Sequence, residues 1–218
     1  MSRRIVLATR NPGKVEELRR ILDDAGLDLD LAGADAFAAL PDVVETGTSF
    51  AANALIKARA AAAYTGLPAI ADDSGLCVDA LNGLPGILSA RWSGRHGDDR
   101  ANLDLLLAQL ADTPDERRGA HFFCAVAVVM PPWRHGTAGV DSPIEPGEER
   151  VVEGQVDGVL IRSPRGTGGF GYDPIFLPYG SSRTTAELDA DEKDAISHRG
   201  QALRALVPVL SAMLGLPR

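Results

Sequence analysis

Two adjacent acidic residues, Asp72 and Asp73, directly follow the apolar run Ala69-Ile70-Ala71. Carboxylates in apolar surroundings are costly unless a cation or hydrogen bonds compensate their charge. Mg²⁺ could compensate it, with one carboxylate binding the metal and the other accepting a proton from an attacking water. Successive strand residues point to opposite faces, so Asp72 and Asp73 need not share one role. The alternative is a polar turn over residues 72–75, and this fragment alone leaves both interpretations open.

The segment 9–14 is a candidate phosphate site, because a short aliphatic run there leads into a helix start. Helix N-termini offer unpaired N–H groups and a favourable dipole to anions. Lys14 adds a full charge, and Thr9 and Asn11 can hydrogen-bond phosphate oxygens. The P-loop spacing is absent, so an ordinary capped helix with a solvated lysine is the alternative.

A third group of polar residues surrounds the start of the next predicted helix. Glu45 could be a further metal ligand, or an acid that the helix dipole favours. Asn53 and Lys57 lie one helical turn apart and therefore share a face. That face could point at a phosphate group or at solvent.

The glycine-rich segment 166–173 allows a ligand to approach the backbone closely, and Phe170 or Tyr172 could stack on a base. A turn with two core aromatics is the alternative. Farther along, His198 and Arg199 fall in the first turn of a helix, where the dipole disfavours a cation. A bound anion or keto oxygen would explain them, and an exposed basic pair is the alternative.

These side chains must be positioned by alternating strands and helices. The predicted strands are 4–9, 27–32, 68–71, 76–81, 120–130 and 151–161, with 72–75 at the end of the third and 131–149 as a surface loop. The predicted helices follow caps at Asn11, 46–49, Asp98 or Asp99, and Ser197. We expect an α/β fold in which a mixed sheet is flanked by helices and the chain forms two lobes.

The composition is that of a globular protein, with 45% hydrophobic and 24% charged residues among 218. We expect one domain over residues 1–218. The net charge of -8 disfavours a nucleic-acid-binding role. Cys77 and Cys124 lie in apolar runs and are expected to be buried thiols. The absence of a signal or membrane-spanning pattern predicts a cytoplasmic protein.

Five stretches together resemble the inosine triphosphate pyrophosphatase family, which removes non-canonical purine nucleotides. They occur in the family's order and span nearly the whole chain. The stretches are ATRNPGK, ETGTSFAANALIKARAAA, LPAIADDSGLCVDALNGLPGILSARWSG, GTGGFGYDPIF and TAELDADEKDAISHRGQAL.

The resemblance implies roles for residues at the matching positions. Glu45 and Asp73 match Mg²⁺ ligands, and Asp73 also matches the catalytic proton acceptor. The substrate-binding positions are Thr9, Arg10, Asn11, Pro12, Gly13, Lys14, Ser74, Phe170, Gly171, Tyr172, Asp173, Lys193, His198 and Arg199. Asn53, Lys57 and Asp72 match further polar positions around the phosphates and the metal.

The resemblance also implies an elongated α/β structure with its active site in a cleft between two lobes, and a homodimer. The implied reaction converts ITP, dITP or XTP to the monophosphate and pyrophosphate. Mg²⁺-activated water attacks the α-phosphorus with Asp73 as general base. Arg10 stands where relatives commonly have a small residue, so it either adds a cation to the phosphate segment or points to solvent. A non-catalytic nucleotide sensor is the competing interpretation, which the carboxylate set argues against.

Overall fold

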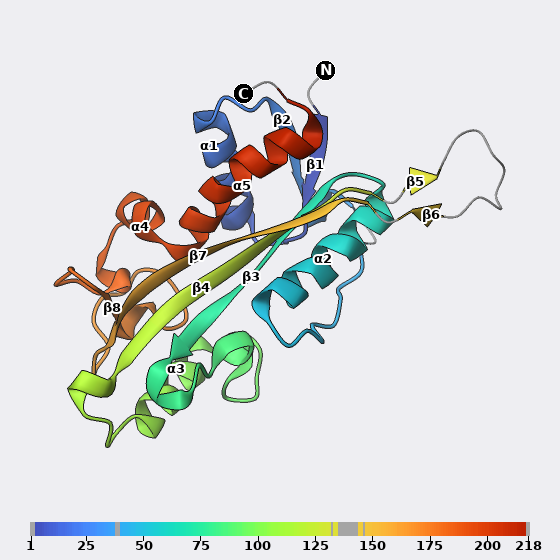
Figure 1. Cartoon of the computed structure of the whole chain (residues 1–218). Helices are drawn as coiled ribbons and strands as arrows, with labels where there is room; N and C mark the ends of the chain where they lie inside the picture. The colour runs from blue at the N-terminus through green and yellow to red at the C-terminus, as the bar shows by residue number, and fades with distance from the viewer. Residues whose placement is uncertain (1–2, 38–39, 132, 135–143, 146, 217–218) are drawn as a thin grey trace. The chain divides into compact units, whose positions relative to one another are not determined.

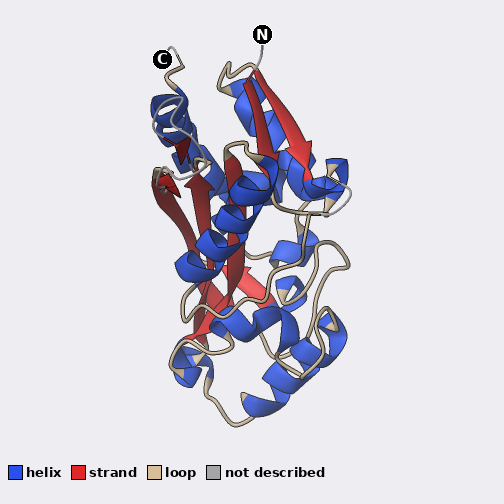
Figure 2. Cartoon of the chain, turned by 90° about the vertical axis from the view of Figure 1, so that its right-hand side faces the viewer, coloured by secondary structure: helices blue, strands red, loops and turns tan. Residues whose placement is uncertain are grey.

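The computed structural model describes residues 3–37, 40–131, 133–134, 144–145 and 147–216. A mixture of helices and strands makes up the chain (Figure 2). The main sheet has, in order, β2 (Leu29–Gly33), β1 (Arg3–Leu7), β3 (Ala69–Val78), β4 (Gly119–Val129), β7 (Glu149–Leu160) and β8 (Phe176–Pro178). β1 pairs in parallel with β2 and β3, whereas β7 and β8 are antiparallel. The predicted mixed α/β sheet is thus confirmed.

Helices α1 (Pro12–Asp24), α2 (Phe50–Thr65), α3 (Asp99–Gln109) and α5 (His198–Leu214) begin where the sequence places their caps (Figure 1). The short helix α4 (Ala190–Ile196), capped by Asp189, was not predicted. The side chains of Asn11, Ser49 and Asp98 accept hydrogen bonds from the first turns of α1, α2 and α3. Gly66 ends α2 in the left-handed conformation, with φ of 66°.

The predicted break after residue 71 is wrong, because β3 runs without interruption from Ala69 to Val78. Asp72 and Asp73 therefore lie inside a strand and not at its end. Their charges meet Lys14 and Lys57, which come from other parts of the sequence. Such long-range compensation lets acidic side chains remain in the strand.

The predicted loop 131–149 also needs correction. Within it, β5 (Trp133–Arg134) and β6 (Ile144–Glu145) form a short antiparallel pair. Residues 132, 135–143 and 146 of this loop lie outside the described residues.

The chain separates into two compact units. The first comprises residues 1–73, 125–152 and 203–218, and the second comprises 74–124 and 153–202. In the first unit, the alanine face of α2 packs against apolar residues of β1, β3 and β4. The small side chains allow close contact between helix and strands.

The second unit has a separate core of larger side chains. Leu103, Leu106 and Leu110 around α3 pack with Tyr172, Phe176 and other buried residues. Cys77 and Cys124 are free and buried, as predicted. No helix in the described part of the chain is long and apolar enough to cross a membrane.

Candidate functional site

The segment between β1 and α1, the proposed phosphate turn, forms a helix start with a side-chain cap. The Asn11 side chain accepts a hydrogen bond from Gly13 N at 2.9 Å, and Asn11 N donates to Thr9 Oγ1 at 3.2 Å. Pro12 fits the first helical position, where no N–H partner is needed. The helix N-terminus and Lys14 thus belong to one local structure in the first unit.

Arg10 does not simply extend into solvent. Its guanidinium contacts the Asp42 carboxylate and donates to the Leu40 carbonyl at 3.0 Å. The residue therefore ties the phosphate turn to the segment that leads to Glu45. This contact is half-exposed, so its contribution to stability is small.

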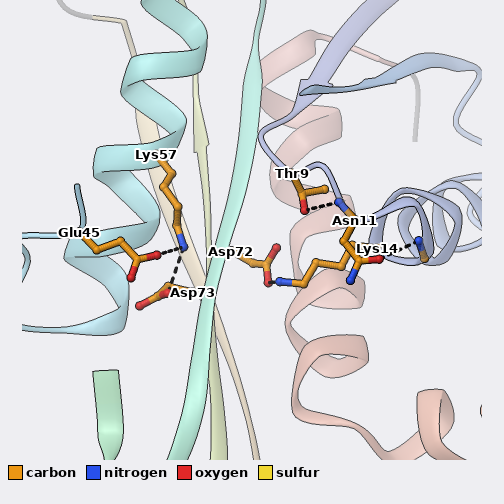
Figure 3. Close-up of polar contacts among 8 residues, drawn as sticks. Thr9, Asn11, Lys14, Glu45, Lys57, Asp72 and Asp73 are labelled. Carbon is orange, nitrogen blue, oxygen red and sulfur yellow. Dashed lines mark hydrogen bonds and ion pairs between the residues drawn. The ribbon is translucent and has the colours of Figure 1, made fainter. Parts of the chain in front are cut away.

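Asp72 and Asp73 point to opposite faces of β3, as strand geometry predicts (Figure 3). Asp72 is buried, and its Oδ2 lies 2.6 Å from Lys14 Nζ. Asp73 faces helix α2 instead and contacts Lys57. The two neighbouring carboxylates consequently belong to two different ion pairs.

Lys57 joins the two carboxylates that the sequence singles out as metal ligands. Its Nζ lies 3.0 Å from Glu45 Oε1 and 3.0 Å from Asp73 Oδ1 (Figure 3). Burial by itself lowers the pKa of Lys57, but the charges of Asp73 and Glu45 raise it above its ordinary value. Burial raises the pKa of Asp73, and the nearby Lys57 only partly offsets this effect. A carboxylate with a raised pKa accepts a proton more readily.

The donor set near Lys57 fits Mg²⁺ only together with a substrate. Among the described residues, no group of three or more His, Cys, Asp or Glu side chains is placed to hold a metal ion. Glu45 and Asp73 nevertheless converge on one point, since both contact the same ammonium group. Mg²⁺ is commonly held by one or two carboxylates, with phosphates and waters completing the octahedron.

In the second unit, Asp173 organises the glycine-rich segment. Its buried carboxylate accepts hydrogen bonds from Phe170 N at 2.8 Å and from Thr185 Oγ1 at 2.8 Å. Lys193 Nζ lies 2.5 Å from Asp173 Oδ2. Three parts of the sequence thereby meet at one carboxylate.

The two aromatic residues of this segment differ in their surroundings. Phe170 is 70% exposed, and Lys193 Nζ lies 4.7 Å from its ring centroid. Tyr172 belongs to the core, and its hydroxyl donates to the Ser89 carbonyl at 2.9 Å. Gly171 N donates to Asp99 Oδ2 at 2.9 Å. Only Phe170 of this aromatic pair presents an exposed ring that could stack on a base.

The start of α5 carries the last two predicted site residues. Ser197 Oγ accepts from Gly200 N at 2.9 Å, which is a cap of the predicted kind. The His198 ring stacks on Phe122 with centroids 4.9 Å apart. Arg199 is only 7% exposed, and burial lowers its pKa to about 10. The alternative interpretation of residues 198 and 199 as an exposed basic pair is therefore wrong for Arg199. With this pKa, Arg199 remains a cation at neutral pH.

Sequence reasoning missed three residues that contact predicted site residues, namely Thr185, Asp99 and Phe122. Thr185 lies in a stretch quoted for the family resemblance, and nothing local marks its hydroxyl as a partner of Asp173. Asp99 is expected only as a helix-start residue, yet its carboxylate also holds Gly171. Ser74, a predicted substrate contact, is part-buried in β3 at the beginning of the second unit.

Comparisons with known proteins agree with the predicted family. The model of the Ham1 family matches residues 5–209. A dITP/XTP pyrophosphatase from Streptomyces coelicolor is 64% identical over 212 residues, covering 97% of this chain and 99% of that protein. A curated dITP/XTP pyrophosphatase from Nocardia farcinica is 54% identical over 211 residues, covering 96% of each chain.

Solved structures show the same fold. A nucleoside-triphosphatase / dITP/XTP pyrophosphatase from Mycobacterium abscessus has 55% identity and a TM-score of 0.76, covering 95% of this chain and 99% of that one. A HAM1 protein from Coxiella burnetii has 42% identity and a TM-score of 0.82, with coverage of 96% and 99%. The matches extend over nearly the full length of both partners, and the chain belongs to the Ham1 family.

Proposed function

We propose that this chain hydrolyses ITP, dITP and XTP to the corresponding monophosphate and pyrophosphate. The observation that carries the proposal is the Glu45–Lys57–Asp73 cluster, in a chain whose close relatives are named dITP/XTP pyrophosphatases. A part-buried carboxylate beside a second carboxylate and a lysine can handle both a proton and a phosphate. Such a set suits hydrolysis better than passive nucleotide binding.

Asp73 is the proposed general base. In the metal-free protein, burial raises the pKa of Asp73 above its ordinary value, and a carboxylate with a higher pKa accepts a proton more readily. In this role it orients a water and removes its proton as the water attacks the α-phosphorus. The bond between the α- and β-phosphates then breaks, and pyrophosphate leaves.

Glu45 and Asp73 are the proposed holders of Mg²⁺. When held there with the substrate, the metal would supply positive charge that offsets the charge developing on the pyrophosphate leaving group. Lys57 contacts both carboxylates and keeps them converging on one point before a nucleotide binds. Its charge also contributes to neutralising the triphosphate.

The phosphate chain is proposed to bind at the N-terminus of α1. The positive end of the α1 helix dipole lies there and favours an anion. Lys14 adds a point charge, which Asp72 holds through their contact at 2.6 Å. Lys193 of the second unit is a further candidate cation for the nucleotide.

Base selection is proposed to depend on hydrogen-bond donors. Hypoxanthine and xanthine carry an acceptor, O6, where adenine carries an amino donor. Arg199 has donors only and stays charged in its buried position. If adenine were bound, its amino group, a donor, would face the donors of Arg199. Such a mismatch costs far more than a lost apolar contact.

The test is a panel of nucleoside triphosphates, assayed for pyrophosphate and for phosphate with Mg²⁺ or with a chelator. The expected result is rapid pyrophosphate release from dITP, ITP and XTP in Mg²⁺, and little from ATP or GTP. Tight ITP binding without any hydrolysis in Mg²⁺ would instead favour a nucleotide-sensing module. The homodimer and the cytoplasmic location stay predictions.

A further inference from the structure

Asn53 connects two parts of the candidate site through a single side chain. It lies on α2 and is fully buried, with 0% of its surface exposed. Its Oδ1 accepts from Gly47 N at 2.8 Å, and its Nδ2 donates to Asp73 Oδ2 at 3.1 Å. A backbone N–H can only donate, so Oδ1 must face Gly47 and the amide nitrogen must face Asp73.

The close packing at Gly47 fixes this connection. A Cβ added to Gly47 would lie 2.6 Å from Asn53 Oδ1, 2.7 Å from Ala52 Cβ and 2.9 Å from Asn53 N. Two of these atoms belong to the backbone or directly adjoin it and are unable to swing aside. Glycine therefore lets the segment that follows Glu45 approach α2 closely enough to bond Asn53.

The two oxygens of Asp73 have different partners. Oδ1 lies 3.0 Å from Lys57 Nζ, and Oδ2 accepts the amide of Asn53. Lys57 alone would leave the carboxylate plane free to rotate, because a terminal carboxyl torsion is broad. A second, directional donor on the other oxygen restricts that rotation.

We propose that Asn53 is a positioning residue for the reaction, an inference that rests on the proposed function. Its amide sets the orientation of the Asp73 carboxylate relative to the segment carrying Glu45. The remaining lone pairs of Asp73 then face a constant direction for the attacking water. Asn53 itself need not touch the substrate.

The variant that removes the donor to Asp73 is Asn53→Asp, which also places a second carboxylate beside it. Aspartate has nearly the same shape and keeps an oxygen for Gly47 N, but it replaces the donor to Asp73 with an acceptor. A matched control is Asn102→Asp on α3. Asn102 is also buried, and its Oδ1 also accepts from a loop, at 2.7 Å from Ser93 N. In the described part of the chain, its Nδ2 has no hydrogen-bond partner.

Steady-state hydrolysis of dITP separates the two variants. For Asn53→Asp we expect kcat to fall on the order of 10²-fold, since a misplaced reacting group costs about that much. KM should stay within about threefold, because the phosphate contacts are retained. Asn102→Asp should keep kcat within about threefold of the wild type. A wild-type kcat in Asn53→Asp, or an equal loss in both variants, would overturn the inference.

If Asn53→Asp fails to fold, two further measurements still test the inference. Gly47→Ala retains the Asn53 side chain but displaces it, because the added Cβ would lie 2.6 Å from Asn53 Oδ1. This variant should also change kcat more than KM. In the wild-type protein without metal, NMR should show one Asn53 side-chain amide proton shifted downfield, and Asp73→Ala should remove the shift. Equivalent amide protons at ordinary shifts in the wild type would contradict the inferred bond. A wild type that releases no pyrophosphate would refute the proposed function, whereas the NMR result tests the Asn53–Asp73 bond separately.

Discussion

Each lysine of the candidate site is held by a buried or part-buried aspartate. Lys14, Lys57 and Lys193 lie 2.6, 3.0 and 2.5 Å from Asp72, Asp73 and Asp173, respectively. A paired lysine has fewer rotamers to lose when a phosphate binds. In the proposed function the aspartates would thereby hold the cations ready for a polyanionic ligand, although the chain as a whole carries a net charge of -8.

Asp73→Asn tests the general base at this scale. The amide has nearly the same shape but accepts a proton poorly, so we expect kcat for dITP to fall at least about 10²-fold. The melting temperature should change by no more than about 4 °C, because the substitution replaces a carboxylate whose ionised form burial disfavours. Steady-state kinetics and calorimetry measure the two quantities.

Asp30→Asn is the matched control. Asp30 is also a strand aspartate in an ion pair, 3.3 Å from Arg4, but it is half-exposed and lies in β2. Asp30→Asn should leave kcat for dITP unchanged. Full activity in Asp73→Asn would remove Asp73 from the mechanism.

Individual site residues were only partly predictable from the sequence. The spacing of Asn53 and Lys57 correctly places them on one face of α2, because helix periodicity is local. Their shared partner, Asp73, follows only from the family resemblance or from the structure. The roles of Thr185 and Asp99 depend on contacts across 12 and 72 residues, which no local pattern encodes.

At the scale of elements, helix starts were predicted well and strand limits less well. Asn11, Ser49 and Asp98 cap their helices through bonds within three residues, so the signal is contained in the sequence. β3 was predicted to break at Asp72 because two adjacent charges are unfavourable in a strand without partners. The compensating lysines are 58 and 16 residues away, so the error has a non-local cause.

Ser49→Ala tests the helix cap that precedes Asn53 and Lys57. Ser49 accepts from Ala52 N at 3.2 Å, and losing such a cap costs about 1 kcal/mol of unfolding free energy. For a protein of this size the melting temperature should fall by about 2–4 °C. Ser182→Ala provides the control, because Ser182 is exposed and its backbone carbonyl accepts a hydrogen bond from Arg165, which the substitution leaves in place. Equal melting temperatures for the two variants would show that the cap contributes nothing.

At the scale of the whole molecule, the chain combines two compact units with separate apolar cores. The first unit contains the phosphate turn and the Glu45–Lys57–Asp73 cluster, and the second contains Phe170, Asp173 and Arg199. Family members match the chain over nearly its whole length, so both sets lie within the part of the chain that matches the family.

Identifying which bond of the triphosphate is cut tests the proposed reaction most directly. Hydrolysis of dITP in ¹⁸O-labelled water, followed by mass spectrometry of the products, identifies the phosphorus that water attacks. The account predicts dIMP carrying one ¹⁸O atom together with unlabelled pyrophosphate. Label in pyrophosphate, or release of inorganic phosphate in place of pyrophosphate, would contradict attack at the α-phosphorus.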